Sequence, residues 1–188
     1  MKLYDNFSSL PNILSFIRIA LTPVFVYLFW QEGVLFVVSI IFFTVAALTD
    51  WLDGHFARKH QQTTDWGGFL DPLADKILVW SALVCCALKG IMPWLVVGVI
   101  VVRDTVVTVL RMIARKRNKT LHTLFAAKCK TVAQFIMLYC TFFLLLIITH
   151  DFPYVGWAVF VGFITLFVAV LTAYTGVEYV YQFYRLKK

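Results

Sequence analysis

The sequence predicts an all-α integral membrane protein, a bundle of six transmembrane helices with a short interfacial helix at the N-terminus. Of its 188 residues, 61% are hydrophobic and only 14% are charged, which is typical of integral membrane proteins. A helical span needs about 20 apolar residues, so six spans use most of the chain. Because the remaining loops are short, we expect a single domain over residues 1–188 whose chemistry is performed by the helices and their ends.

The helices are expected where apolar stretches lie between residues that interrupt helices. Gly33, Gly67 and Gly90 fall at three such interruptions. Pro93 follows Gly90 in the third of these, and Pro153 lies in a further one; proline is favoured at the start of a helix. A short amphipathic segment before the first helix is expected to lie in the membrane interface. The predicted helices span residues 12–30, 34–57, 69–89, 92–116, 125–149 and 154–184.

The basic residues predict the orientation of the bundle. In this arrangement, only Lys89 of the seventeen basic residues lies in a loop on the far side. By the positive-inside rule, both termini and the loops 58–66 and 115–130 are cytoplasmic. The net charge of +7 therefore forms a cytoplasmic face that suits anionic lipid. Because this charge is spread over loops that flank the membrane, we do not expect nucleic-acid binding.

Four of the ten acidic residues lie at spacings of 3, 18 and 4 residues within one stretch of the chain. A carboxylate in hydrocarbon costs roughly 3 kcal/mol, so the group needs a compensating partner. Spacings of i,i+3 and i,i+4 put each pair on one helix face, and a tight turn brings the pairs opposite each other. No histidine or cysteine belongs to this group of aspartates, which disfavours zinc, whereas an all-oxygen set of ligands favours two Mg²⁺ or Mn²⁺ ions. These residues, called the aspartate motif below, are Asp50, Asp53, Asp71 and Asp75.

The residues around the aspartate motif suit a phosphate ligand, which such ions bind. Gly54 directly follows an aspartate and lets a ligand approach the backbone closely. Ala57 keeps the same helix face small. Arg58 supplies a planar, permanently charged donor for phosphate.

The residues of this stretch resemble the signature of a known family. The pattern Asp-x2-Asp-Gly-x2-Ala-Arg-x8-Gly-x3-Asp-x3-Asp is complete between Asp50 and Asp75, and it is the signature of the CDP-alcohol phosphotransferases. The resemblance implies six transmembrane helices, an interfacial N-terminal helix and a homodimer. It also implies a reaction in which an alcohol acceptor displaces CMP from a CDP-linked donor.

Further stretches are similar to the bacterial phosphatidylglycerophosphate synthase branch of this family. That likeness implies CDP-diacylglycerol as donor, glycerol 3-phosphate as acceptor, and an active site on the cytoplasmic side of a bacterial membrane. Ala127 departs from the branch, which usually has glycine there. The similar stretches are Leu10-Pro11-Asn12 with Arg18 and Pro23, residues 70–76, Arg103-Asp104 with Leu110-Arg111, Lys128-x-Lys130-Thr131, and Gly176-Val-Glu178-Tyr179.

The resemblance also implies roles for the signature residues. Asp50, Asp53 and Asp71 would ligate the metal ions. Asp75, at the edge of the second metal position, would also be the general base that takes the proton of the acceptor hydroxyl. The CDP part of the donor would be contacted by Asp50, Gly54, Ala57 and Arg58, with Gly67 at the turn.

Four basic residues of the fourth and fifth helices are candidates for binding the acceptor phosphate. Arg103, Arg111, Lys128 and Lys130 are expected near the same cytoplasmic level, and arginine with lysine is the expected surrounding of a phosphate dianion. Arg103 lies deep in its helix for a residue that merely flanks the membrane. The alternative for Arg103 is a salt bridge to Asp104 or to another buried carboxylate.

Other functions remain open on the sequence alone. Inositol phosphate, serine or phosphatidylglycerol could replace glycerol 3-phosphate as acceptor within the same family. A divalent-cation transporter also places acids in helices, but it would place them near the bilayer midplane beside broken helices. Here the acids gather at one interface and are followed by an arginine, which favours phosphate chemistry. A purely structural membrane protein leaves the cost of four acids unexplained.

Overall fold

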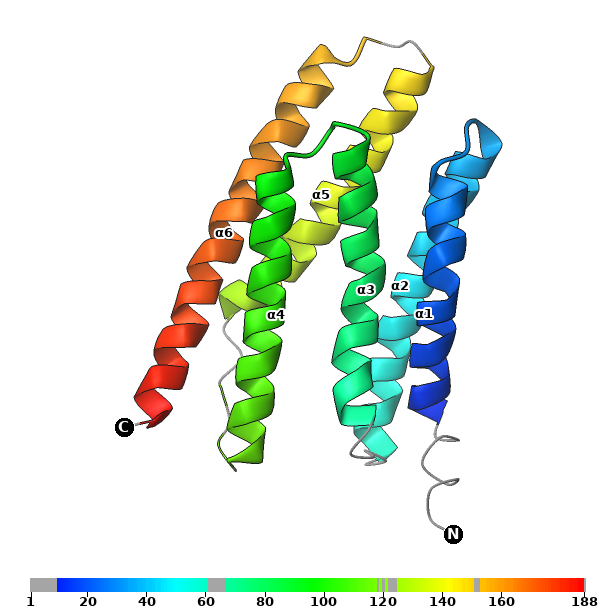
Figure 1. Ribbon diagram of the computed structural model, residues 1–188. Helices are drawn as coiled ribbons and strands as arrows, with labels where there is room; N and C mark the ends of the chain where they lie inside the picture. Colours follow the sequence, from blue (N-terminus) through cyan, green and yellow to red (C-terminus); the bar gives the residue numbers. More distant parts are fainter. Residues whose placement is uncertain are drawn as a thin grey trace. The chain divides into compact units, whose positions relative to one another are not determined.

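The computed structural model describes the backbone of residues 10–60, 67–117, 119, 121, 125–150 and 153–187, and the side chains of residues 19–49, 76–115, 117, 119, 121, 125–150 and 153–186. Every regular element in these ranges is an α-helix, as the sequence predicts. The helices are α1 (Leu10–Phe29), α2 (Val34–His60), α3 (Gly67–Leu88), α4 (Trp94–Lys116), α5 (Phe125–Thr149) and α6 (Val155–Lys187) (Figure 1).

The six predicted helices are all present, and their ends differ from the predicted ones by no more than three residues. Two of them, Phe125–Thr149 and Val155–Leu186, are long and apolar enough to cross a membrane by length and composition, within the residues described. In α4, Arg103, Asp104 and Arg111 interrupt the apolar pattern. Six membrane crossings therefore remain a prediction. The expected interfacial helix precedes Leu10 and lies outside the described residues.

The chain divides into two compact units, residues 1–85 and residues 86–188. In the first unit, α1 packs against α2. Gly33 closes the turn between them with a φ of 60°, in the left-handed region that glycine adopts readily. Below this turn, aromatic side chains form the contact between the two helices: the ring centroid of Phe25 lies 5.7 Å from that of Phe29 and 5.5 Å from that of Phe43. All three side chains are fully buried.

In the second unit, α6 is the helix against which both α4 and α5 pack. Gly90, with a φ of 77°, turns the chain before Pro93, which caps the start of α4. The chain runs through α4 and α6 in the same direction and through α5 in the opposite direction (Figure 1). The C-terminal ends of α4 and α6 and the N-terminal end of α5 therefore lie at one end of this unit.

The side chains of α6 are arranged for a lipid environment. Phe163, Phe167 and Val177 are more than half exposed, whereas Thr172 and Thr175 are fully buried. In water this distribution would expose the apolar face and bury the polar one. In a bilayer it is favourable, because lipid covers the apolar face and the small polar residues allow close helix packing. The same pattern brings polar side chains of α6 toward α4 and α5.

Candidate active site

The aspartate motif occupies the end of α2 and the start of α3. Asp50 and Asp53 lie one turn apart in α2, and Asp71 and Asp75 lie one turn apart in α3. The helical backbone thus confirms that each pair shares a helix face. The side chains themselves lie outside the described residues, so the convergence of the four carboxylates stays a prediction. Gly54, Ala57 and Arg58 belong to the same stretch of α2, and Gly67 is the first residue of α3.

The carboxylates of the motif are the residues on which a metal site depends. Among the side chains that the structure describes, no group of three or more histidine, cysteine, aspartate or glutamate residues could hold a metal ion. The donor set of the motif nevertheless fits a hard divalent cation, because it contains only carboxylate oxygens. A helical spacing of three or four residues lets two such side chains reach one ligand.

A second group of polar residues lies inside the second unit, and its centre is Asp104 of α4. Lys130 of α5 donates two hydrogen bonds from Nζ to this carboxylate, at 2.8 Å to Oδ1 and 3.0 Å to Oδ2. Arg103 donates a third from Nη1 to Oδ1, at 3.0 Å. The exposed fractions of the three side chains are 10% for Asp104, 2% for Lys130 and 11% for Arg103. Burial on this scale requires such pairing, because an isolated buried charge is costly.

Arg103 keeps part of its hydrogen-bonding capacity. The salt bridge to Asp104, considered above as the alternative role of Arg103, is present. It uses only Nη1, however, and Nε and Nη2 are buried without a hydrogen-bond partner among the described residues. A buried guanidinium nitrogen without an acceptor is unfavourable unless a ligand supplies one. The contact with Asp104 is therefore compatible with anion binding by the rest of the group.

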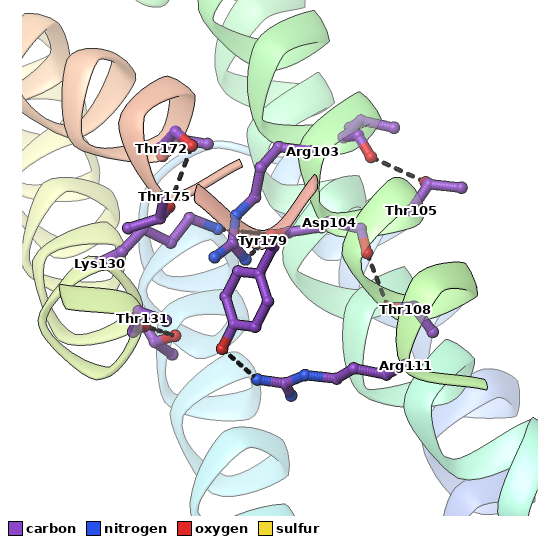
Figure 2. A network of polar contacts seen from close by, with 12 residues as sticks. Arg103, Asp104, Thr105, Thr108, Arg111, Lys130, Thr131, Thr172, Thr175 and Tyr179 are labelled. Carbon is purple, nitrogen blue, oxygen red and sulfur yellow. Dashed lines mark hydrogen bonds and ion pairs between the residues drawn. The ribbon is translucent and has the colours of Figure 1, made fainter. Parts of the chain in front are cut away.

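Arg111, two helical turns further along α4, is held by α6. Its Nη2 donates a hydrogen bond of 2.6 Å to the hydroxyl oxygen of Tyr179 (Figure 2). Its Cζ lies 5.0 Å from the centroid of the Tyr179 ring, and the Cζ of Arg103 lies 5.5 Å from the same centroid. Both distances are within the range of cation–π attraction. These five residues, called the polar cluster below, are Arg103, Asp104, Arg111, Lys130 and Tyr179.

The net charge of the polar cluster suits a doubly charged anion. Three cationic side chains and one carboxylate leave two net positive charges. Arg103 and Lys130 lie in the interior, whereas Arg111 is exposed, so the charge extends from the protein interior to its surface. A phosphate monoester carries nearly two negative charges at neutral pH. The polar cluster can therefore bind such a group by charge-assisted hydrogen bonds.

The structure brings together three of the four basic residues predicted for the acceptor phosphate. Lys128 is exposed, and no described contact joins it to the polar cluster. Its position explains the difference from Lys130, because residues two apart on a helix point to different faces. Sequence reasoning gave no role to Tyr179, although the residue stands in one of the stretches similar to the family. The spacing of Thr172, Thr175 and Tyr179 could have indicated it, because it places these polar side chains on one face of α6.

Comparison with known proteins identifies the kind of protein that this chain resembles. Residues 8–175 match the sequence model of the family described as CDP-alcohol phosphatidyltransferase. The chain is 35% identical over 187 residues to the CDP-diacylglycerol–glycerol-3-phosphate 3-phosphatidyltransferase of Blochmanniella floridana, covering 96% of this chain and 93% of the relative. It is 36% identical over 141 residues to the Bacillus subtilis protein of the same name, covering 68% of this chain and 73% of the relative.

A third relative is the probable phosphatidylglycerophosphate synthase of Mycobacterium tuberculosis, which is 37% identical over 131 residues, covering 68% of this chain and 62% of the relative. Two of the three relatives are thus phosphatidyltransferases by name, and the third is a probable phosphatidylglycerophosphate synthase. The predicted resemblance is confirmed, and the transferase is favoured over the cation transporter. Together with the two long apolar helices, the match indicates a membrane protein.

Proposed function

The chain belongs to the CDP-alcohol phosphatidyltransferase family, and we propose that it transfers the phosphatidyl group of CDP-diacylglycerol to glycerol 3-phosphate, releasing CMP. The names of its relatives support this choice of substrates. The observation that carries it is the polar cluster, in which Arg103 has two buried nitrogens without a partner among the described residues and the net charge matches a phosphate dianion. Serine and other acceptors without a phosphate would leave these donors unused.

The donor is assigned to the aspartate motif. Asp50, Asp53, Asp71 and Asp75 would hold one or two Mg²⁺ or Mn²⁺ ions, which when bound neutralise the diphosphate and polarise its phosphorus–oxygen bonds. Arg58 would bind a donor phosphate with its guanidinium group. The CDP part of the donor would also contact Asp50, and Gly54 and Ala57 would leave room for it, with Gly67 at the turn into α3.

Transfer needs a hydroxyl nucleophile and a base. The hydroxyl oxygen of the acceptor forms a bond to the phosphorus of the phosphatidyl group, and the bond from that phosphorus to the CMP oxygen breaks. Asp75 would take the hydroxyl proton on its carboxylate, and CMP would leave with the electron pair of the broken bond. The polar cluster would hold the phosphate of the acceptor.

The acceptor is assigned to the polar cluster. Arg103 and Arg111 would donate hydrogen bonds to its phosphate, and Lys130, already paired with Asp104, would add positive charge. Lys128, on the exposed side of α5, would attract the acceptor from solution. Glycerol 3-phosphate is soluble and doubly charged, so it must arrive through water rather than through lipid.

The proposal includes a position in the membrane. All six helices would cross it, with an interfacial helix before them, and residues 1–188 would act as a single catalytic domain in a homodimer. Both termini and the loops 58–66 and 115–130 would face the cytoplasm, as the positive-inside rule predicts. The active site would then lie on the cytoplasmic side of a bacterial cytoplasmic membrane. The lipid tails of CDP-diacylglycerol would stay in the bilayer, since each buried CH₂ is worth about 0.8 kcal/mol.

The test is CMP release by the purified protein in lipid nanodiscs that contain CDP-diacylglycerol. Four acceptors are compared: glycerol 3-phosphate, inositol phosphate, serine and phosphatidylglycerol. We expect CMP release that depends on glycerol 3-phosphate, with phosphatidylglycerophosphate as the lipid product. Release that depends only on another acceptor would contradict the proposed substrate and leave the family assignment intact.

A further inference from the structure

Tyr179 is a fully buried aromatic residue of α6 with two kinds of contact. Its ring belongs to a small apolar cluster with Val107 of α4 and Ala127 of α5, against which Leu121 packs. Its hydroxyl accepts the hydrogen bond from Arg111. A buried tyrosine normally has a hydrogen-bond partner for its hydroxyl, but here the partner is an exposed cation. The packing therefore fixes the ring, and the ring in turn fixes an exposed arginine.

The same ring also contacts Arg103, although the two arginines begin far apart. Eight residues separate them on α4, which is about 12 Å along the helix axis. Even so, both Cζ atoms lie within 5.5 Å of the centroid of the Tyr179 ring. Two guanidinium groups brought to one ring repel each other, and more so away from water. Among the described residues no carboxylate pairs with Arg111, and an arrangement that gathers like charges in this way favours an anionic ligand.

Gly176, one helical turn before Tyr179, gives Arg103 its space. A Cβ atom at position 176 would lie 3.0 Å from the Cγ and 3.7 Å from the Cβ of Arg103. The first distance is tighter than an ordinary carbon contact, and Cγ lies near the backbone, so the arginine side chain would have to give way by a few tenths of an ångström. Two residues of α6 thus affect the arginines: the absent side chain at Gly176 leaves space for Arg103. The ring of Tyr179 lies beside both Arg103 and Arg111 (Figure 2).

We propose that Tyr179 is a positioning residue for acceptor binding: assisted by Gly176, it holds Arg103 and Arg111 where both bind the phosphate of the acceptor. This inference rests on the proposed function, because it assumes that the acceptor carries a phosphate. Tyr179 itself takes no part in bond making. Its contribution is to order two long side chains before the acceptor arrives, which lowers the conformational entropy that binding would otherwise cost.

The first experiment replaces the hydroxyl alone. Tyr179→Phe keeps the ring and its packing but removes the acceptor of the Arg111 hydrogen bond. We expect the KM for glycerol 3-phosphate to rise about tenfold, since a hydrogen bond to a charged group is lost, while kcat and the KM for CDP-diacylglycerol stay within about twofold. Tyr181→Phe is the matched control, because Tyr181 lies on the same helix, is exposed, and has its own arginine, Arg185, at 4.7 Å from its ring centroid.

The second experiment tests whether Tyr179 acts through Arg111. In an Arg111→Ala background, the change Tyr179→Phe should have no further effect on the KM for glycerol 3-phosphate, because the group that it positions is gone. If the KM of the double variant instead rose by the product of the two single-variant increases, Tyr179 would act by another route, and the proposal would be overturned. Binding of inorganic phosphate, measured by calorimetry on the same variants, gives a readout that does not depend on turnover.

The third experiment tests Gly176 against a glycine with free space. Gly176→Ala should raise the KM for glycerol 3-phosphate by displacing Arg103, whereas Gly162→Ala, on the same helix and with nothing within 4 Å of an added Cβ, should not. Equal effects of the two substitutions would assign the change to helix stability and contradict the proposal.

These outcomes separate the inference from the function on which it rests. If the wild-type protein uses only a phosphate-free acceptor, the proposed function fails. If it uses glycerol 3-phosphate and Arg103→Ala raises that KM, but Tyr179→Phe and Gly176→Ala leave it unchanged, only the positioning role fails.

Discussion

The aspartate motif and the polar cluster differ in how the chain assembles them. The motif spans 26 consecutive residues at the end of α2 and the start of α3, and its members are spaced by the helical repeat. The polar cluster draws one residue from α5, one from α6 and three from α4. Only Arg103 and Asp104 are neighbours in the sequence; the other hydrogen bonds described in the cluster join residues 26 positions apart, as in Lys130 and Asp104, or 68 positions apart, as in Arg111 and Tyr179.

The carboxylates of the two regions also have different roles. In the aspartate motif we propose that they bind metal ions and accept a proton. In the polar cluster the carboxylate of Asp104 already has two cationic partners, so its role is to hold Lys130 and Arg103 in place. An acid in a membrane helix can thus be part of the chemistry or a support for it, and the partners decide which.

Removal of divalent metal should have the largest effect. Excess EDTA should abolish CMP release, because the four carboxylates of the aspartate motif would otherwise repel one another and the donor diphosphate. Added Mg²⁺ or Mn²⁺ should restore it. Elemental analysis of the purified protein gives the bound metal directly. Full turnover in EDTA by a protein without bound metal would contradict the role of the motif.

The change Asp75→Asn should lower kcat by about 10²–10⁴-fold, which is the usual contribution of a general base. Donor binding should survive, because Asp50, Asp53 and Asp71 remain as metal ligands. Steady-state kinetics and a separate measurement of CDP-diacylglycerol binding check both parts. A nearly normal kcat would mean that the base lies elsewhere.

Asp104→Ala should act on stability rather than on chemistry. It leaves two buried cations without their carboxylate, and breaking a buried ion pair costs about 3–5 kcal/mol. Denaturant-induced unfolding in detergent should show this loss. Glu32→Ala, at an exposed turn, is the control and should leave the unfolding midpoint unchanged. If Asp104→Ala were as stable as the wild type, the assignment of Asp104 as a support would be wrong.

Arg103→Ala should raise the KM for glycerol 3-phosphate by about 10–100-fold, because charged hydrogen bonds to a phosphate are worth about 1.5–3 kcal/mol. The KM for CDP-diacylglycerol should change little. The variant Arg115→Ala, an exposed arginine later in the same helix, should leave both constants unchanged. Equal effects of Arg103→Ala on both substrates would mark the residue as structural.

The smallest effect concerns orientation. Single cysteines at Gln62 and at Arg117, in a background without the four native cysteines, should leave activity nearly unchanged. Both should react with a membrane-impermeant thiol reagent only from the cytoplasmic side, as the basic residues around them predict. Labelling of the two positions from opposite sides would contradict the shared orientation of the two loops.

Most of the fold could be predicted from the sequence, because helix limits depend on local features. The helix ends can be predicted to within a few residues from the length of the apolar stretches and from the positions of Gly33, Gly90 and Pro93. Six crossings could not be established in the same way: in α4 the charges of Arg103 and Arg111 look like an interruption until their partners are known. The exposed position of Lys128 beside the buried Lys130 likewise depends on the face that α5 turns toward α6.

By itself, the sequence determined the helical class, the pairing of aspartates at helical spacing and the signature that identifies the family. These properties are local, since a helix repeats every 3.6 residues wherever it lies. Only the tertiary structure decided that Asp104 pairs with Lys130 and that Tyr179 contacts both Arg103 and Arg111. It also decided that two buried nitrogens of Arg103 have no hydrogen-bond partner among the described residues. Those contacts depend on how α4 and α5 pack against α6. Side chains on three helices meet at positions set by that packing, which no spacing along one helix specifies.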